Sequence, residues 1–172
     1  MLKLEPYILP KVELTLNIKD FEKFHSHIRA VSSLNGFDDI LMLKKTIDAA
    51  SHSAVISGSL ITLTFHDEVS FDPALRDSLE ILKVPYKAAC LNNPFCQDKV
   101  FCYSPNAVPQ RKEALISKKV EGELYLLSTE QIRDLLASDD SVLRARLKEF
   151  VDGPLSGYEL DEKTDILDSI LR

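Results

Sequence analysis

The sequence has 172 residues, of which 45% are hydrophobic and 28% are charged. A chain of this length is expected to form one domain, or one domain with a small appendage, and to bury a core without disulfides. Its composition is typical of a globular protein and excludes a disordered, collagen-like or coiled-coil chain. The 21 basic and 27 acidic residues give a formal net charge of -6, whereas proteins that bind nucleic acid usually carry a basic surface. We therefore expect no nucleic-acid partner.

The first residues and the cysteines predict the compartment. Lys3, Glu5 and two prolines interrupt the apolar stretch MLKLEPYILPK, so it lacks the continuous apolar core of a signal peptide. No segment is long enough and apolar enough to cross a bilayer, which predicts that the protein has no membrane partner. The three cysteines are an odd number and cannot all pair with each other, as expected for a reducing compartment. The sequence thus predicts a cytoplasmic protein.

The first third of the chain predicts a strand followed by two helices. Residues 11–18, KVELTLNI, alternate between apolar and polar side chains, which is typical of a half-buried strand. Asp20 is the expected N-cap of a helix that Asn35-Gly36 ends. The apolar stripe of this helix consists of Phe21, Phe24, Ile28, Val31 and Leu34. A second helix is predicted over 38–50, capped by Asp38 or Asp39, although residues 40–43 also fit a buried strand.

The middle of the chain predicts a hairpin, a helix and two further strands. The segments AVIS and SLITLTF flank Ser57-Gly58-Ser59, a tight-turn sequence. Asp72-Pro73 supplies an N-cap and a proline in the first helical turn, which predicts a helix over 73–82. The segments YKAACL and KVFCYS, separated by NNPFCQD, are then expected to be short strands that pair with each other or with the hairpin.

The order of these elements resembles the ferredoxin-like split βαβ unit, with one helix inserted. The resemblance is one of element order only, and it implies an α+β fold without implying a function. After it, residues 105–112 are the best candidate for an internal linker or a long loop. An extra hairpin is predicted around Glu121-Gly122, and C-terminal helices follow it.

The last 45 residues are predicted to be helical. Ser128 and Gln131 fit a capping box, and Ile132, Leu135 and Leu136 form the apolar side of the helix that follows. A second helix begins at 138–141 and ends at Gly153-Pro154. Its side chains predicted to face inward are Val142, Leu143, Leu147 and Phe150. A last amphipathic helix is expected after Asp161. We therefore predict a sheet domain over 1–127 and a helical extension over 128–172, packed as one compact unit.

Two groups of residues are candidates for chemistry. His66, Asp67 and Glu68 place an imidazole and two carboxylates at the end of a predicted strand, where a general base or a metal ligand set could form. Cys90 and Cys102 could lie close together if their strands are neighbours. Free cysteines usually pack as small hydrophobic residues, and Cys96, in the connecting loop, is the thiol expected to be exposed and thus the candidate to test for reactivity. The cysteine spacing matches no common metal knuckle, and we predict neither a metal nor a cofactor.

These patterns leave two functional hypotheses. The first is a non-catalytic module, a regulator or inhibitor, that binds a protein partner through a sheet edge or through the acidic C-terminal helices. Residues 128–172 carry 6 basic and 11 acidic residues, and a terminal amphipathic helix can dock in a groove. The same features would also suit a homodimer. The alternative is a small hydrolytic or thiol-dependent enzyme that uses His66, Asp67, Glu68 or Cys96.

Overall fold

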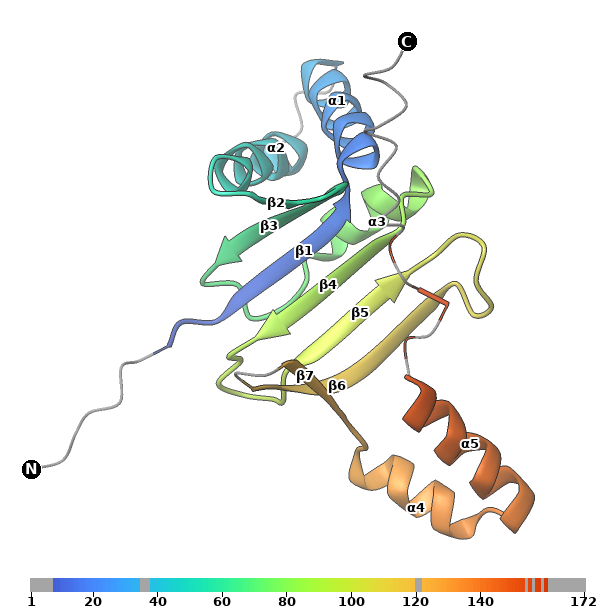
Figure 1. The fold of residues 1–172 in the computed structure, drawn as a ribbon. Coiled ribbons are helices and arrows are strands. Elements are labelled where there is room, and N and C mark those ends of the chain that lie inside the picture. Colours follow the sequence, from blue (N-terminus) through green and yellow to red (C-terminus); the bar gives the residue numbers. More distant parts are fainter. Residues whose placement is uncertain are drawn as a thin grey trace, which may run out of the picture.

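The computed structural model describes residues 8–34, 38–119, 122–153, 155, 157, 158 and 160. Within these residues the chain forms five helices and a single antiparallel sheet of seven strands, in the order β2-β3-β1-β4-β5-β6-β7 (Figure 1). The strands are β1 Lys11–Asn17, β2 Val55–Ser57, β3 Leu60–His66, β4 Tyr86–Leu91, β5 Lys99–Tyr103, β6 Arg111–Lys119 and β7 Gly122–Leu126. The helices are α1 Ile18–Leu34, α2 Asp38–Ser51, α3 Pro73–Ile81, α4 Thr129–Ala137 and α5 Asp140–Asp152. The predicted α+β class is confirmed.

The strand β1 lies inside the sheet, between β3 and β4. Its alternating sequence places Val12, Leu14 and Leu16 on the face that the helices cover, where all three are buried. The opposite face of β1 and β3 is polar, and the Thr15 and Thr62 hydroxyls meet there at 3.0 Å. One face of this part of the sheet therefore supports the core, and the other carries polar groups.

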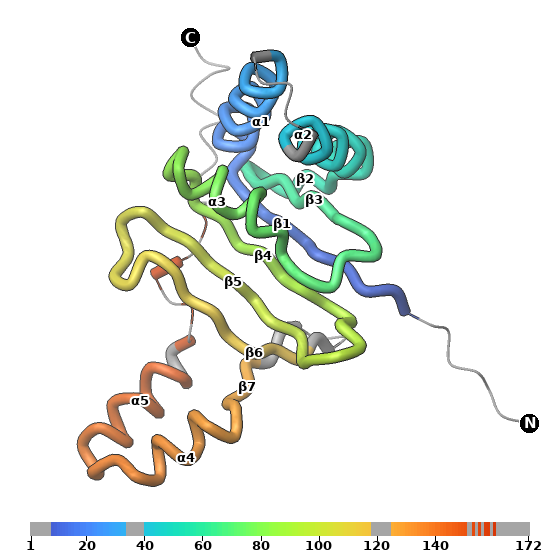
Figure 2. Tube along the Cα trace, turned by 180° about the vertical axis from the view of Figure 1, so that it is seen from behind, coloured from blue at the N-terminus to red at the C-terminus, as the bar shows by residue number. Residues whose placement is uncertain are grey.

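Three helices, α1, α2 and α3, cover one face of the sheet (Figures 1 and 2). They contribute Phe24, Ile28, Ile47, Leu75 and Leu79 to the main core. Every helix in the described part of the chain is too short or too polar to cross a bilayer.

The N-cap predicted for α1 is wrong. The helix begins at Ile18, so Asp20 lies in its first turn, where burial raises the pKa of the Asp20 carboxyl. The Oδ1 of Asn17 accepts a hydrogen bond from the Lys19 backbone N–H at 3.0 Å. Asn17 thus takes the capping role, because the chain turns directly from β1 into the helix. The predicted end of this helix at Asn35-Gly36 falls outside the described residues.

The other predicted elements of the first half are confirmed. Residues 38–51 are helical rather than a buried strand, while the side chains of Asp38 and Asp39 lie outside the described part. Gly58 has a φ of 58° in the turn between β2 and β3, a conformation that glycine adopts without strain. The Asp72 carboxylate accepts hydrogen bonds from the backbone N–H groups of Ala74 and Leu75 and so caps α3.

Of the residues 105–112 predicted as a linker or long loop, 105–110 lie in a hairpin loop and Arg111 and Lys112 begin β6. Residues 104–110 connect β5 to β6 in a hairpin closed by the Ser104 N–H and the Gln110 carbonyl at 3.0 Å, and β6 begins at Arg111. The second hairpin joins β6 to β7, and its predicted turn at 120–121 lies outside the described residues.

The strand β4 is buried on both faces because residues after α5 return to the sheet. Leu155 and Tyr158 pack against Ala89, Leu91, Val100 and Ile116, on the face opposite the three helices. The Tyr158 hydroxyl also donates a hydrogen bond to the Pro109 carbonyl. This second cluster holds the C-terminal side of the chain on β4, β5 and β6. The helix predicted after Asp161 lies outside the described residues.

The helices α4 and α5 form a helical arm that projects from the end of the sheet where β6 and β7 lie (Figures 1 and 2). The predicted capping box is present, with the Ser128 hydroxyl accepting from the Gln131 N–H at 3.1 Å and the Ser128 N–H donating to Gln131 Oε1 at 2.7 Å. Asp139 caps α5, and the helix ends at Asp152 with Gly153 as its C-cap.

The apolar sides predicted for the arm are only partly covered. On α4, Leu135 is buried, whereas Ile132 and Leu136 are exposed. On α5, Val142 and Leu147 are exposed rather than inward-facing, and Leu143 and Phe150 are half-buried. The predicted inward orientation of Val142 and Leu147 is therefore wrong. The helices α4 and α5 pack chiefly on each other and make no extensive contact with a strand, so much of the apolar side of each helix is left uncovered.

Candidate functional site

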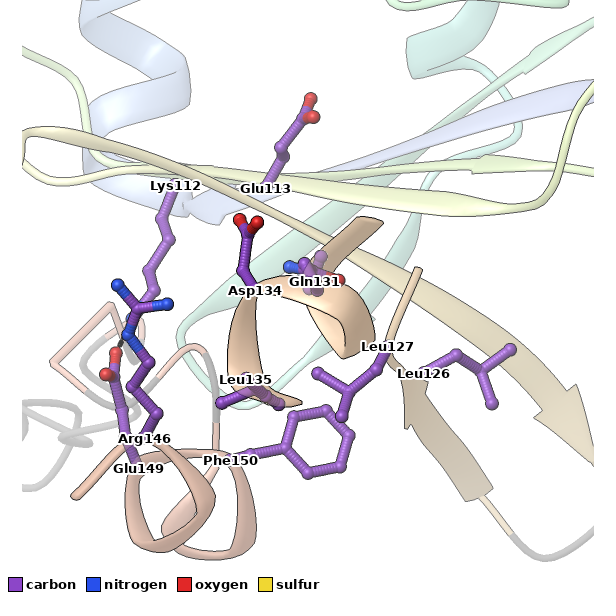
Figure 3. Close-up of a pocket in the computed structure, with 11 residues that line it drawn as sticks. Lys112, Glu113, Leu126, Leu127, Gln131, Asp134, Leu135, Arg146, Glu149 and Phe150 are labelled. Carbon is purple, nitrogen blue, oxygen red and sulfur yellow. Dashed lines mark hydrogen bonds and ion pairs between the residues drawn. The ribbon is translucent and has the colours of Figure 1, made fainter. Parts of the chain in front are cut away.

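The arm encloses a cleft where it meets β6 and the end of β7. The cleft has a volume of about 260 Å³, just below the range typical of small-molecule pockets. Its apolar lining consists of Ala114, Leu126, Leu127, Leu135 and Phe150, and its polar lining of Lys112, Glu113, Gln131, Asp134, Arg146 and Glu149 (Figure 3).

Local periodicity explains why these residues share the cleft. On α4, Gln131, Asp134 and Leu135 are separated by three and four positions, and such residues lie on one side of a helix. Arg146, Glu149 and Phe150 repeat the same spacing on α5. On β6, Lys112 and Ala114 share one face, whereas Glu113 between them lies on the other. Figure 3 accordingly shows the Glu113 carboxylate pointing away from the helices.

Charged groups of both signs surround an apolar floor. The Lys112 Nζ lies 2.6 Å from Glu149 Oε1 and joins the sheet to α5. This hydrogen bond lowers the pKa of the Glu149 carboxyl, and the charges of Lys112 and Arg146 act in the same direction. Leu127, Leu135 and Phe150 lie together on the opposite side of the cleft (Figure 3). Such a site can hold an apolar side chain and align polar groups around it.

Some polar groups of the cleft are already engaged by other residues of the chain. None of the described residues that line it is a histidine, cysteine or serine. The Gln131 amide oxygen already accepts the Ser128 N–H, and the Glu149 carboxylate is paired with Lys112. Two polar side chains of the lining are therefore already engaged within the protein.

The residues predicted to carry chemistry lie elsewhere, at one end of the sheet. His66 ends β3 opposite Lys11 of β1, and Asp67 and Glu68 begin the loop toward α3. Cys96 lies in the loop between β4 and β5. All four side chains are exposed.

A hydrogen bond joins the two loops that carry these residues. The Asn93 Nδ2 donates to the Val69 carbonyl at 2.7 Å. In the part of the chain that the structure describes, however, no hydrogen bond or ion pair links the four candidate side chains to each other. No group of three or more His, Cys, Asp or Glu is placed there to hold a metal ion. The structure thus brings the two loops together.

Cys90 and Cys102 occupy opposite faces of the sheet. Cys90 pairs with Lys99, and Cys102 pairs with Lys87, so the two cysteines are separated by an odd number of positions in the register. Cys90 therefore packs in the core beneath the helices, and Cys102 packs in the cluster with Leu155 and Tyr158. The expectation that they come close is wrong, because neighbouring strand positions point to opposite faces. Burial raises the pKa of the Cys90 thiol.

This placement predicts the reactivity of the thiols. In the folded protein we expect iodoacetamide to modify one cysteine, Cys96, because Cys90 and Cys102 are buried and Cys96 is exposed. Intact mass spectrometry should show a single adduct before denaturation and three adducts after it. In Cys96→Ser, the folded protein should gain no adduct. Equal labelling rates for Cys90 and Cys96 in the folded protein would contradict the assignment.

Sequence reasoning did not predict the cleft. The spacing of the polar residues on α4 and α5 indicated which of them share one side of each helix. No local sequence pattern, however, places those helices beside Lys112 and Ala114 of β6. Compared with protein-family models, with curated proteins and with solved structures, the chain matches none of them.

Proposed function

We propose that this protein is a non-catalytic interaction module, and that its helical arm and the cleft beneath it bind a protein partner. The partner segment would be amphipathic, with an apolar side chain entering the cleft toward Leu127, Leu135 and Phe150. Its polar groups would meet Lys112, Arg146, Asp134 and Glu149 at the rim. A rim that carries both positive and negative charges suits a partner segment that also carries charges of both signs.

The observation that carries this proposal is the apolar surface left uncovered on the arm. Leu136 is 78% exposed, and Ile132, one turn before it on α4, is also exposed. Val142 and Leu147 add exposed apolar side chains on α5. Apolar side chains grouped on a projecting element are typical of interaction surfaces, because a partner that covers them removes apolar area from water.

The arm can be regarded as an addition to a simpler unit. We infer that β1, α1, β2, β3, α3 and β4 form a ferredoxin-like arrangement, with α2 as the inserted helix. The strand order β2-β3-β1-β4 supports this inference. The strands β5 to β7 then extend the sheet, and α4 and α5 form the described helices of the predicted extension. We also propose that the protein acts in the cytoplasm, as its three cysteines suggest.

The proposal is tested by comparing two substitutions of equal exposure. Leu136 on the arm is 78% exposed, and Ile81 at the end of α3 is 77% exposed, so either can become Asp without opening the core. We expect Leu136→Asp to reduce the recovered partner about tenfold, the loss typical of an important interface side chain. Ile81→Asp should leave the recovery unchanged.

The measurement is affinity capture from the native cells with quantitative mass spectrometry, combined with a photo-reactive amino acid at position 136 or 81. Cross-linked protein should form at 136 and not at 81, and both Asp variants should melt at the wild-type temperature. Equal capture by the two Asp variants, or cross-links at 81 only, would exclude the arm as the binding surface.

A further inference from the structure

A second cavity lies at the opposite side of the molecule from the arm. It has a volume of about 320 Å³ and is bounded by α2, the end of β3, the segment from β3 to α3, and the start of α3. None of its lining residues belongs to α4 or α5. Any ligand of this cavity would therefore be separate from the partner proposed for the arm.

The floor of this cavity is apolar and is part of the folded core. Val12, Phe65, Phe71 and Leu75 line it, and all four are buried. Phe71 is fixed further by an edge contact with Tyr86, with ring centroids 5.3 Å apart. Met42 and Leu43 of α2 close one side, and the exposed Met42 stands at the opening. Because the floor belongs to the core, the cavity exists before a ligand arrives, which lowers the cost of binding.

The charged groups that line this cavity are all acidic. They are the carboxylates of Glu68 and Asp72, with the hydroxyls of Thr46 and Ser70 beside them. The Asp72 carboxylate accepts the N–H groups of Ala74 and Leu75, so it is already engaged by the start of α3. In the described part of the chain, no hydrogen bond or ion pair engages the Glu68 carboxylate. An available carboxylate thus stands at the edge of an apolar cavity.

We propose that this cavity binds a small organic cation, a molecule with an apolar body of about one ring that carries an ammonium group. The apolar body would displace water from Val12, Phe65 and Leu75, and the ammonium group would lie at the mouth beside Glu68. Two phenylalanine rings in the floor also favour a nearby cation over an anion. An anionic ligand would face two carboxylates and no basic side chain of the lining. Glu68 is thereby assigned a binding role instead of the catalytic one.

The test uses 2-phenylethylammonium, the neutral 2-phenylethanol and the anionic 3-phenylpropanoate, which share one aromatic ring. Each is titrated into the full chain while backbone amide shifts are followed by NMR. We expect the ammonium compound to bind with a Kd of about 1 mM, as is usual for a ligand of this size. The largest shifts should lie at Leu43, Ser70 and Leu75. The alcohol should bind more weakly, and the carboxylate most weakly.

Two variants and a control distinguish charge recognition from apolar binding. Glu68→Gln should weaken the ammonium compound about three- to fivefold, as for one partly exposed ion pair, and leave the alcohol unchanged. Thr46→Trp, at an exposed position of α2, should fill the cavity and abolish both. Glu22→Gln, an exposed glutamate on α1, should change neither. Equal affinity for the three compounds, unchanged ammonium binding in Glu68→Gln, or the absence of shifts at the lining residues would overturn the proposal.

Discussion

Replacing both Leu155 and Tyr158 by alanine is expected to lower the free energy of unfolding by about 3–6 kcal/mol, from the burial of two large side chains. Both are buried against β4, β5 and β6, where they cover Leu91, Val100 and Ile116. The variant also loses the hydrogen bond from the Tyr158 hydroxyl to the Pro109 carbonyl. Because domains of this kind are stable by only about 5–15 kcal/mol, the loss is a large part of the total.

Urea denaturation monitored by circular dichroism measures this change. Leu136→Ala is the matched control, since Leu136 is exposed on the arm and its truncation should change the free energy of unfolding by less than about 0.5 kcal/mol. A double variant with the wild-type denaturation midpoint would show that Leu155 and Tyr158 do not cover the sheet in solution. Deleting 155–172 would remove core side chains, whereas a cut after Leu160 keeps them and isolates residues 161–172.

Removing the Glu80 side chain is expected to cost about 2–4 kcal/mol, because it leaves a buried hydroxyl without its acceptor. The Glu80 side chain is 9% exposed. It accepts hydrogen bonds from the Tyr86 hydroxyl at 2.8 Å and from Arg111 Nε at 2.6 Å. Burial, followed by the bond to Glu80, raises the pKa of Tyr86, so the tyrosine stays neutral and continues to donate. This network joins α3 to β4 and β6.

The comparison of Glu80→Ala with Glu80→Gln separates the contribution of the hydrogen-bond acceptor from that of the charge. Gln keeps an acceptor for the Tyr86 hydroxyl but loses the charge that faces Arg111. We therefore expect Glu80→Gln to lose about half as much free energy of unfolding as Glu80→Ala. Glu130→Ala, an exposed position on α4, should have nearly no effect. Thermal and urea unfolding give the three values. If Glu80→Ala and Glu130→Ala were equally stable, the network would contribute nothing. Arg111 directly precedes Lys112, which lines the cleft. Partner binding by Glu80→Ala therefore also reports whether the contact between Glu80 and Arg111 positions the cleft.

Sequence reasoning predicted those parts of the fold that depend on neighbouring residues. The Asp72 cap, the Ser128 capping box and the turn at Gly58 each involve groups within a few positions of one another. Their geometry is therefore determined locally. The misplaced cap of α1 is the exception, since Asn17 and Asp20 are both good caps. The direct turn from β1 into the helix decided between them.

The candidate site was predictable only in part. The residue types of His66, Asp67, Glu68 and Cys96 suggested chemistry, and the topology does bring their loops to one end of the sheet. Whether their side chains interact depends on positions that no local pattern specifies. The cleft at the arm could not be predicted for the same reason. It requires β6 to lie beside helices about 20 to 35 positions later in the chain.

By its own periodicity and capping residues, the sequence determined the helices, the strands and the apolar stripes of this protein. Only the tertiary structure decided which stripes would be covered and which would remain on the surface of the arm. It also decided that Cys90 and Cys102 face opposite sides, since a shift of one position in the register of β4 and β5 would reverse a whole strand. Periodicity is a property of adjacent residues, whereas register and cover depend on contacts between distant segments.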